Sequence, residues 1–345
     1  MKRVGLDARS TRQMSVGMKQ YARELTARLP KVAPEFEYAV FSRGGNFGWS
    51  EQVALPFSIA RSHVDLVHLL SLYTPLIVPA KSILTIHDLI HLHFPKYFKV
   101  KVGIYYRTVV RRACARAERV ITDDERTVED LERFLGVNPR KVRVIPLGVD
   151  PVILSSPPVT LSTPDVILSL SKGRPYFLYV GNHRRHKNLR TLLAAWQALP
   201  ERCDVDLLFT GPDDFDGELQ RASSGRRRAE ALGDVPLDRL AELYRDARAL
   251  VHPALREGFG LPLLEAMASG TPVVASADAI PRVLEPAALS FPAEDVAALT
   301  ARLLEVLDDE GLRDRLVNEG RMLARHLTWD RCARATADVY REVLA

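Results

Sequence analysis

The sequence predicts an α/β protein of two similar lobes, each built on a parallel sheet. The chain has 345 residues, enough for two domains with a core each. In both halves, short apolar strands alternate with amphipathic helices, which is typical of doubly wound parallel sheets. Between the halves lies a segment rich in proline and serine, residues 151–174, which we interpret as a linker. We therefore expect lobes over 1–150 and 175–328, with a ligand-binding cleft between them.

The first lobe is expected to begin with a strand at Arg3–Leu6 and an amphipathic helix at Met18–Leu29, which Pro30 should end. A helix at Val128–Leu135 should end at Gly136. The other strands of this lobe are predicted at Tyr38–Phe41, Leu66–Leu70, Ser82–Ile86, Arg119–Thr122 and Lys141–Ile145.

The second lobe repeats the pattern. Its strands are predicted at Tyr176–Val180, Val205–Thr210, Ala249–His252 and Pro272–Ala275. Its helices are predicted at Leu189–Leu199, Asp238–Asp246 and Pro262–Ala268, with Gly270 capping the last and further helices after Glu294. Because active sites of such sheets lie at the carboxyl ends of the strands, the loops that follow the strands are the segments to inspect.

Composition excludes several classes of protein. An apolar share of 47% and a charged share of 26% are ordinary for a globular chain, and no run of eighteen apolar residues predicts a spanning helix. A net charge of +5 is too small to indicate nucleic-acid binding. Cys114, Cys203 and Cys332 lie far apart, and the amino-terminus carries charges where a signal peptide needs an apolar core. We expect reduced core thiols and a cytoplasmic protein.

The strongest local signal is the run EGFGLPLLEAMASG at 257–270, after a predicted strand. Gly258 and Gly260 leave backbone N–H groups uncovered, and Pro262 suits the first turn of a helix. Such a helix start can accommodate a diphosphate, while Glu257 and Glu265 can accept hydrogen bonds from sugar hydroxyls. An ordinary capped surface helix explains the same spacing equally well.

Two further loops follow predicted strands. The segment GNHRRHKN at 181–188 places Arg184, Arg185 and Lys187 at a strand end, where they could stabilise a departing diphosphate; an exposed basic loop is the plain alternative. His87 and Asp88 follow the strand at 82–86. His91 and His93 nearby suggest a metal, but their spacing does not define a tetrahedral site, and no metal is predicted.

Three weaker features remain. At Ser15–Gly17 a small residue could let a ligand approach closely. The pairs Asp123-Asp124 and Asp213-Asp214 are interpreted as helix caps and turn residues. The basic, aromatic segment 96–119 predicts an amphipathic helix, which is either a solvated face over a core stripe or a contact with an anionic membrane or ligand.

The chain resembles the retaining glycosyltransferase family 4, whose sequence motifs it carries in the same order along the chain. This family has the GT-B fold, in which two Rossmann-like lobes face each other across a cleft. The resemblance rests on five stretches and covers nearly the whole chain: SVGMKQYARELTARL, TIHDLIHLHFPKYF, VIPLGVD, YVGNHRRHKN and AELYRDARALVHPALREGFGLPLLEAMASGTPVVAS. It implies that the helix at 329–345 returns to pack on the first lobe. It also implies that the first lobe binds the acceptor and the second binds the donor.

The resemblance implies transfer of a hexose, of mannose or glucose type, from a GDP- or UDP-sugar to a saccharide or lipid-linked acceptor. No metal or cofactor is implied. Glu257 would approach the donor sugar and Glu265 would hold the ribose. Lys187 would neutralise the diphosphate, and His87 would face the sugar. The remaining donor-binding residues would be Gly17, Phe259, Gly260 and Leu261, together with one of Arg184 and Arg185.

Departures from the family pattern leave a second class open. Many members carry an arginine where this chain has Asn182, so Arg184 or Arg185 must substitute. A GT-B protein that binds nucleotide sugars without turnover is therefore the alternative. A nicotinamide-dependent dehydrogenase is disfavoured, because no GxGxxG follows the first strand. The form of the lysine loop resembles mannosyltransferase-type members, which act in surface polysaccharide or glycolipid synthesis, on the inner face of a membrane.

Overall fold

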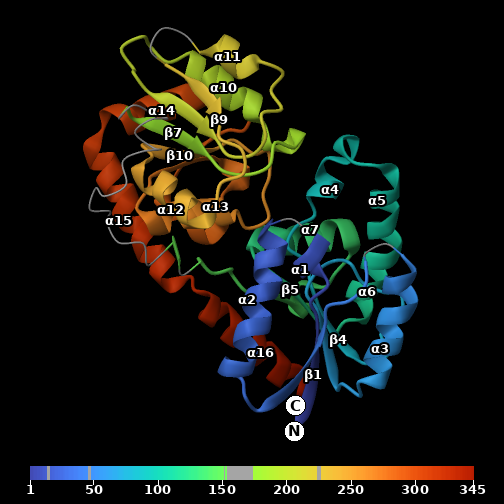
Figure 1. Ribbon diagram of the computed structural model, residues 1–345. Coiled ribbons are helices and arrows are strands. Elements are labelled where there is room, and N and C mark those ends of the chain that lie inside the picture. Colours follow the sequence, from blue (N-terminus) through green and yellow to red (C-terminus); the bar gives the residue numbers. More distant parts are fainter. Residues whose placement is uncertain (14–15, 46–47, 151, 154–173, 224–226) are drawn as a thin grey trace. The chain divides into compact units, whose positions relative to one another are not determined.

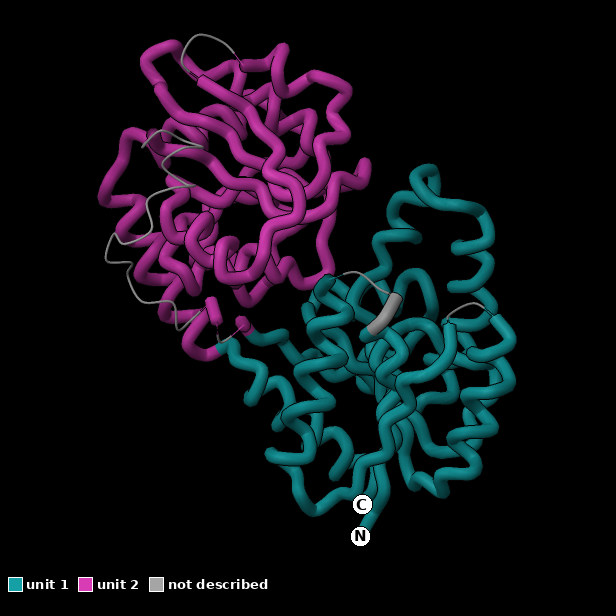
Figure 2. Tube along the Cα trace, in the orientation of Figure 1, with its two compact units in different colours: residues 1–148, 327–345 teal, residues 149–326 magenta. Residues whose placement is uncertain are grey.

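The computed structural model describes residues 1–13, 16–45, 48–150, 152–153, 174–223 and 227–345. It divides into two compact units: unit 1 contains 1–148 and 327–345, and unit 2 contains 149–326 (Figure 2). Within the described residues each unit carries a sheet of six parallel strands (Figure 1). The predicted α/β class with two doubly wound sheets is therefore confirmed. Of the predicted linker, residues 151 and 154–173 lie outside the described part of the chain.

The sheet of unit 1 has the strand order β2-β1-β3-β4-β5-β6. Its strands are β1 (Lys2–Asp7), β2 (Phe36–Phe41), β3 (Leu66–Leu69), β4 (Lys81–Thr85), β5 (Arg119–Thr122) and β6 (Val142–Val144). The helices of this unit are α1 (Ser10–Gln13), α2 (Val16–Val32), α3 (Leu55–Arg61), α4 (Ile90–His93), α5 (Val100–Tyr105), α6 (Arg111–Arg116), α7 (Glu125–Leu135) and α16 (Trp329–Leu344). The inner strands β3 and β4 are buried along their length except at Lys81, as expected of a parallel sheet that is covered on both faces.

Helices α2 and α16 pack together on one face of this sheet. Tyr21 of α2 reaches Thr85 of β4 across 3.0 Å, and Tyr340 of α16 reaches His68 of β3 across 2.6 Å. A side chain at Gly148, which precedes the crossing into unit 2, would overlap the backbone of Trp329 at the start of α16. The carboxyl-terminal helix thus belongs to unit 1.

Helix α2 corrects one prediction. It continues through Pro30 to Val32 instead of ending at the proline. Leu29 and Ala33 are fully buried, and the Ala33 N–H donates to the Leu29 carbonyl across 3.0 Å. Packing on both sides of the proline therefore holds the final turn, although Pro30 supplies no N–H of its own.

Capping residues explain the bounds of α7. The Asp124 carboxylate accepts a hydrogen bond from the Arg126 N–H across 2.9 Å at the first turn. Gly136 ends the helix in the left-handed region, at φ +67°, as the sequence predicted. The basic segment forms a short 3-10 turn at Pro95–Tyr97 and then runs through α5, a π-helical stretch at 106–110, and α6.

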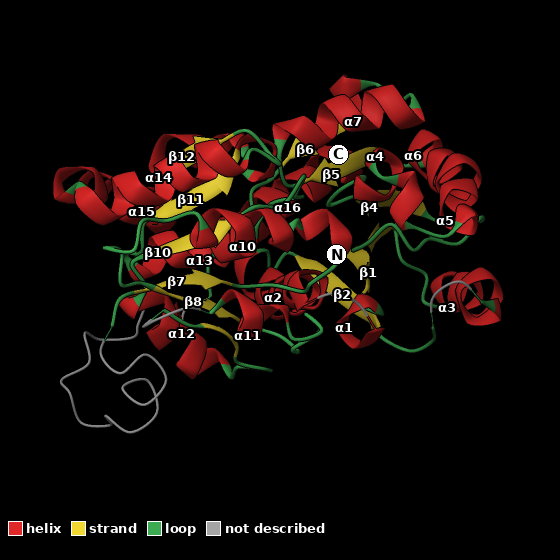
Figure 3. Cartoon of the chain, turned by 90° about the horizontal axis from the view of Figure 1, so that it is seen from above, coloured by secondary structure: helices red, strands yellow, loops and turns green. Residues whose placement is uncertain are grey.

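Unit 2 has the strand order β12-β11-β10-β7-β8-β9. Its strands are β7 (Tyr176–Tyr179), β8 (Asp206–Phe209), β9 (Ala229–Ala231), β10 (Ala249–His252), β11 (Val273–Ser276) and β12 (Ala288–Phe291). Its helices are α10 (Leu189–Gln197), α11 (Glu218–Ala222), α12 (Leu237–Asp246), α13 (Leu261–Ser269), α14 (Val296–Asp308) and α15 (Glu310–His326). Helices α10, α11 and α14 share one core with the strands, while α12, α13 and α15 pack together (Figure 3).

Strand order fixes where the functional loops emerge. From β7 the chain proceeds outward to β8 and β9, and from β10 it proceeds in the opposite direction to β11 and β12. Since β7 and β10 are neighbours, the direction of winding reverses between them. In open α/β sheets ligands bind at such a reversal, beyond the carboxyl ends of the strands.

Candidate functional site

The loop after β7 and the loop after β10 are joined by hydrogen bonds. The Leu255 N–H donates to the His186 carbonyl across 2.8 Å, and the Asn188 side-chain amide donates to the Pro253 carbonyl across 3.1 Å. The first loop carries Lys187 and the second carries Glu257. The reversal in strand order therefore brings together two residues seventy positions apart.

The Lys187 ammonium makes an ion pair with the Glu257 carboxylate. The same oxygen, Oε1, lies 2.7 Å from Nε2 of His252, the last residue of β10. Lys187 and His252 are buried, and the Glu257 side chain is 13% exposed. Burial raises the pKa of Glu257, but the charge of Lys187 and the hydrogen bond from His252 outweigh it and hold this pKa well below its usual range. Glu257 is therefore ionised at neutral pH.

The sequence interpretation did not identify His252, although it contacts the candidate residue Glu257. Its ring stacks on Tyr179 of β7, with centroids 5.8 Å apart, and burial lowers its pKa. A neutral ring with its proton on Nε2 donates to Glu257, and Nδ1 then has no hydrogen-bond partner among the described residues. The sequence did contain a signal for His252, because it is a polar residue at the carboxyl end of a predicted buried strand, where active sites of such sheets lie.

The start of α13 presents backbone donors. Gly260 adopts φ +69°, and a Cβ there would lie 3.1 Å from Cδ1 of Leu263, so glycine is strongly favoured at this position. Within the described chain, the N–H groups of Gly258, Phe259 and Gly260 make no hydrogen bond. Together with the positive end of the helix dipole, such N–H groups favour an anion. Phe259 and Leu261 are buried and their side chains are apolar, so the backbone is the only part of either residue that could donate a hydrogen bond to a ligand.

Glu265, on α13, has a different environment. It is buried, and its Oε2 accepts a hydrogen bond from the Tyr244 hydroxyl of α12 across 2.8 Å. Burial, which outweighs this hydrogen bond, raises the pKa of Glu265 to about 7. Tyr244 was not identified from the sequence, because it comes from another helix.

The two predicted arginines differ from Lys187 in position. Arg184 and Arg185 are exposed, whereas Lys187 is buried. The loop that carries them is fixed by His183, whose Nδ1 lies 2.5 Å from an Asp214 carboxylate oxygen and whose Nε2 lies 2.8 Å from the Thr210 carbonyl. The interpretation of Asp214 as a turn residue is thus incomplete, since its carboxylate also anchors the lysine loop.

In unit 1, His87 follows β4 and is buried. Its Nδ1 lies 2.5 Å from Oδ2 of Asp123, which follows β5. Burial disfavours the charged ring, but Asp123 outweighs it and raises the pKa of His87, with a smaller contribution from the Leu70 backbone. Nε2 of His87 has no hydrogen-bond partner among the described residues. Asp123 was interpreted as a cap, which was wrong: Asp124 alone caps α7, because Asp123 points to the neighbouring strand's histidine.

The other unit 1 candidates have local partners. Gly17 is half-buried near the start of α2, and Ser15 lies outside the described residues. His93 pairs with Asp130 at 2.8 Å, and His91 contacts the Tyr106 hydroxyl at 3.1 Å. In the part of the chain that the structure describes, no three His, Cys, Asp or Glu side chains gather as metal ligands would.

Two family profiles match the chain. The one described as Glycosyltransferase Family 4 matches residues 17–152, and the one described as Glycosyl transferases group 1 matches residues 174–309. Among similar proteins, O-antigen chain mannosyltransferase B of Escherichia coli is 36% identical over 173 residues, covering 48% of this chain and 45% of that protein. Phosphatidyl-myo-inositol mannosyltransferase of Mycobacterium leprae is 35% identical over 173 residues, covering 48% and 46%. The matched part therefore spans about half the length of these relatives.

Solved structures share the fold over the whole chain. Sucrose-phosphate synthase from Thermosynechococcus elongatus superposes with a TM-score of 0.78 at 20% identity, covering 100% of this chain and 99% of that one. Anabaena HepE, solved in complex with UDP and glucose, superposes with a TM-score of 0.76 at 16% identity, covering 99% and 100%. At these identities the likeness establishes the GT-B fold.

Proposed function

Because this chain belongs to glycosyltransferase family 4, with its two halves matching the two family domains, we propose that it transfers a hexose from a nucleotide-diphosphate sugar to a saccharide or lipid-linked acceptor. The observation that carries the proposal is the contact of Lys187 with Glu257 beside the unpartnered N–H groups of Gly258–Gly260. The proposed transferred sugar is mannose or glucose, from a GDP- or UDP-sugar donor, and the similarity to mannosyltransferases favours mannose.

The diphosphate is the part of the donor that this site suits best. The N–H groups at the start of α13 and the Lys187 ammonium all carry positive charge or partial charge. A diphosphate competes with Glu257 for Lys187, so the ion pair of the donor-free protein opens when donor binds. Arg184 or Arg185, both on the surface of the same loop, adds a second cation.

The chemistry follows from this placement. The bond between the anomeric carbon and the diphosphate oxygen breaks, and Lys187 with the N–H groups stabilises the charge on the leaving oxygen. The acceptor hydroxyl forms the new bond on the same face and gives its proton to the departing phosphate, so configuration is retained. Glu257 remains ionised, held by His252, and accepts hydrogen bonds from the sugar hydroxyls. None of these steps needs a metal ion.

Glu265 is the proposed ribose ligand. Its carboxylate can accept from both ribose hydroxyls, which does not select the base, so GDP and UDP donors remain equal candidates. Unit 1 is proposed to bind the acceptor and to supply His87, whose raised pKa suits it to donate a hydrogen bond. Gly17, in the same unit, leaves room for close approach.

A peripheral contact with an anionic membrane is the remaining part of the proposal. Throughout the described residues, every helix is too short or too polar to cross a bilayer. On α5, Val100 is 81% exposed and Ile104 57% exposed, among exposed lysines and arginines. Apolar side chains within a cationic surface favour anionic lipid. Flotation with phosphatidylglycerol vesicles should exceed flotation with phosphatidylcholine; equal flotation contradicts this contact.

The direct test is a thermal-shift panel of GDP- and UDP-sugars, followed by mass spectrometry of products with candidate saccharide and lipid-linked acceptors. A stabilising donor that yields glycosylated product supports the transferase. The alternative, a nucleotide-sugar-binding protein without turnover, predicts a thermal shift with neither product nor released sugar. No shift with any donor contradicts both.

A further inference from the structure

One crossover in unit 1 lacks its helix. Strands β3 and β4 are parallel neighbours, and their connection, residues 70–80, contains no helix. Crossovers between parallel strands usually carry an α-helix that covers the sheet. Pro75 and Pro79 explain the exception, because each lacks an N–H and disfavours helical geometry in the residue before it. On the face that α3 and α6 cover, this loop takes the place of a helix.

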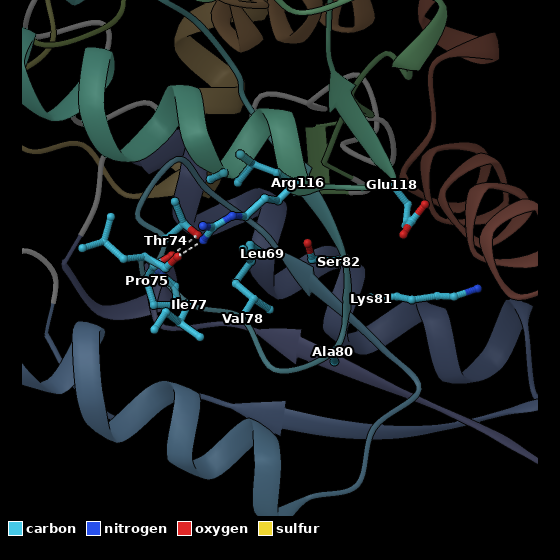
Figure 4. A pocket seen from close by; sticks show the side chains of 13 residues that line it. Leu69, Thr74, Pro75, Ile77, Val78, Ala80, Lys81, Ser82, Arg116 and Glu118 are labelled. Carbon is cyan, nitrogen blue, oxygen red and sulfur yellow. Dashed lines mark hydrogen bonds between the residues drawn. The ribbon is translucent and has the colours of Figure 1, made fainter.

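The missing helix leaves a cavity of about 520 Å³ (Figure 4). Its walls are largely aliphatic: Leu69 and Leu84 come from the strands, Val78 and Ala80 from the loop, and Ala113 from α6. The volume lies within the range of small-molecule sites. Thr74, Lys81, Ser82, Arg116 and Glu118 add polar and charged groups to the lining, so the cavity suits a molecule that has both a hydrocarbon part and a polar part.

The mouth of the cavity is apolar and cationic. Leu76 is 43% exposed and Ile77 67% exposed, although both side chains are aliphatic. The Arg116 guanidinium donates to the Leu76 carbonyl across 2.6 Å, and the exposed Arg112 lies one turn earlier on the same face of α6. Figure 4 shows Arg116 reaching toward Thr74 and Pro75, while Lys81 and Glu118 lie at the other end of the cavity.

The apolar surface continues onto the neighbouring segment. The Leu76 N–H donates to the side-chain oxygen of Gln52 across 2.9 Å, which fixes the loop against the π-helical stretch Ser50–Ala54. Val53 of that stretch is 50% exposed, and Phe57 of α3 is 62% exposed. Exposed apolar side chains gathered around a cavity mark a binding surface.

We propose that this cavity receives an acyl chain of an anionic phospholipid, with the lipid phosphate against Arg112 and Arg116. Aliphatic walls bind the chain, exposed apolar residues at the mouth enter the lipid surface, and the two guanidinium groups neutralise the phosphate. The site lies wholly in unit 1 and uses none of the residues assigned to sugar transfer. It can therefore fail while the proposed transferase stands, and the reverse also holds.

A soluble lipid separates the chain from the headgroup. The full chain is titrated by calorimetry with dihexanoyl phosphatidylglycerol below its micelle concentration. Glycerophosphoglycerol, the same headgroup without chains, and dihexanoyl phosphatidylcholine, the same chains on a zwitterionic headgroup, are the comparison ligands. We expect measurable binding of the first and at least about tenfold weaker binding of the other two, a difference of roughly 1.4 kcal/mol. Equal binding of the chain-free headgroup overturns the proposal.

Two pairs of variants locate the site. Ala113→Phe fills the cavity, and Ala115→Phe adds the same group at an exposed position of the same helix. We expect the first to lower affinity for dihexanoyl phosphatidylglycerol about tenfold and the second to leave it within about twofold. Arg116→Gln should weaken binding more than Arg111→Gln, which removes equal charge beside Gly136. Equal effects within either pair overturn the assignment.

If circular dichroism shows that Ala113→Phe does not fold, Ile77→Ser provides an independent test. Ile77 is exposed, so this change spares the core but removes the apolar mouth, and affinity should fall several-fold. Unchanged affinity contradicts the proposal. Sedimentation velocity tests whether a second copy of the chain occupies the cavity instead of a lipid. If the chain self-associates and Ala113→Phe abolishes that association, the cavity is an interface between copies and the lipid proposal is overturned.

Discussion

Glu257 and Glu265 lie eight residues apart in one run, yet their surroundings give them opposite electrostatics. Around Glu257, Lys187 and His252 converge on one carboxylate oxygen, and its pKa falls well below the usual range. Around Glu265, the one side-chain hydrogen-bond partner of the carboxyl group among the described residues is the neutral Tyr244 hydroxyl, and burial raises the pKa of Glu265 to about 7. The ionisation state of a glutamate here is set by residues contributed from other strands and helices.

This difference matches two proposed tasks. A carboxylate that stays ionised beside a cation can hold a sugar while charge develops at the diphosphate. A carboxyl group with a pKa near neutrality gains hydrogen-bond donors when ribose arrives and becomes fully ionised at that moment. Substitutions that exchange these surroundings are therefore the sharpest tests of the comparison.

Lys187→Ala should have the largest effect. It removes the cation that lowers the pKa of Glu257 and the proposed charge that neutralises the leaving diphosphate. We expect kcat/KM for sugar transfer to fall about 10³-fold, with the circular dichroism spectrum unchanged. Arg190→Ala is the control, since it removes a cation three residues away whose side chain is 87% exposed. Equal losses in the two variants would withdraw the assignment of Lys187.

Glu257→Gln and Glu265→Gln should separate catalysis from donor binding. For Glu257→Gln we expect kcat to fall about 10²-fold with little change in the donor KM. For Glu265→Gln we expect the donor KM to rise about tenfold while kcat stays close to that of the wild type. Steady-state kinetics with a stabilising donor checks both. The opposite split between kcat and KM would exchange the two roles.

The same pair should differ in how stability depends on pH. The pKa of Glu265 is raised from 4.5 to about 7, so the folded chain binds the proton more tightly than the unfolded chain. The stability that this tighter proton binding gives the folded chain is fully present below pH 4.5 and is lost as pH rises through about 7. The free energy of unfolding of Glu265→Gln should therefore rise by about 3 kcal/mol relative to that of the wild type between pH 4 and pH 8, as measured by urea unfolding. Because the pKa of Glu257 is lowered, we expect the opposite trend with pH for Glu257→Gln. If the difference in unfolding free energy between Glu265→Gln and the wild type does not change with pH, the raised pKa of Glu265 is refuted.

His252→Phe should have the smallest effect and the most specific one. It keeps a ring against Tyr179 but removes the hydrogen bond to Glu257, so the pKa of Glu257 should rise. We expect kcat to fall several-fold and the acidic limb of the pH–rate profile to move to higher pH. His252→Gln, which retains an N–H donor, should restore part of that shift. A change in KM alone would assign His252 a packing role.

Particular residues show how far the sequence could go. Apolar runs and glycine or aspartate caps predicted the strands and the ends of α7 and α13, because these signals are local. Short elements with weaker patterns, such as β9 and β12 at the sheet edges, were not predicted. Pro30 misled the interpretation, since local helix breaking was overcome by burial of Leu29 and Ala33.

The sequence by itself determined the α/β class, the repeated alternation and the candidates Glu257, Glu265 and Lys187, because periodicity and motif spacing lie within short stretches of chain. Only the tertiary structure decided their partners: His252 for Glu257, Tyr244 for Glu265 and Asp123 for His87. It also revealed the cavity beneath residues 74–80. Parallel strands bring together loops that are distant in sequence, and burial sets the charge of what meets there, so both depend on contacts that no local pattern encodes.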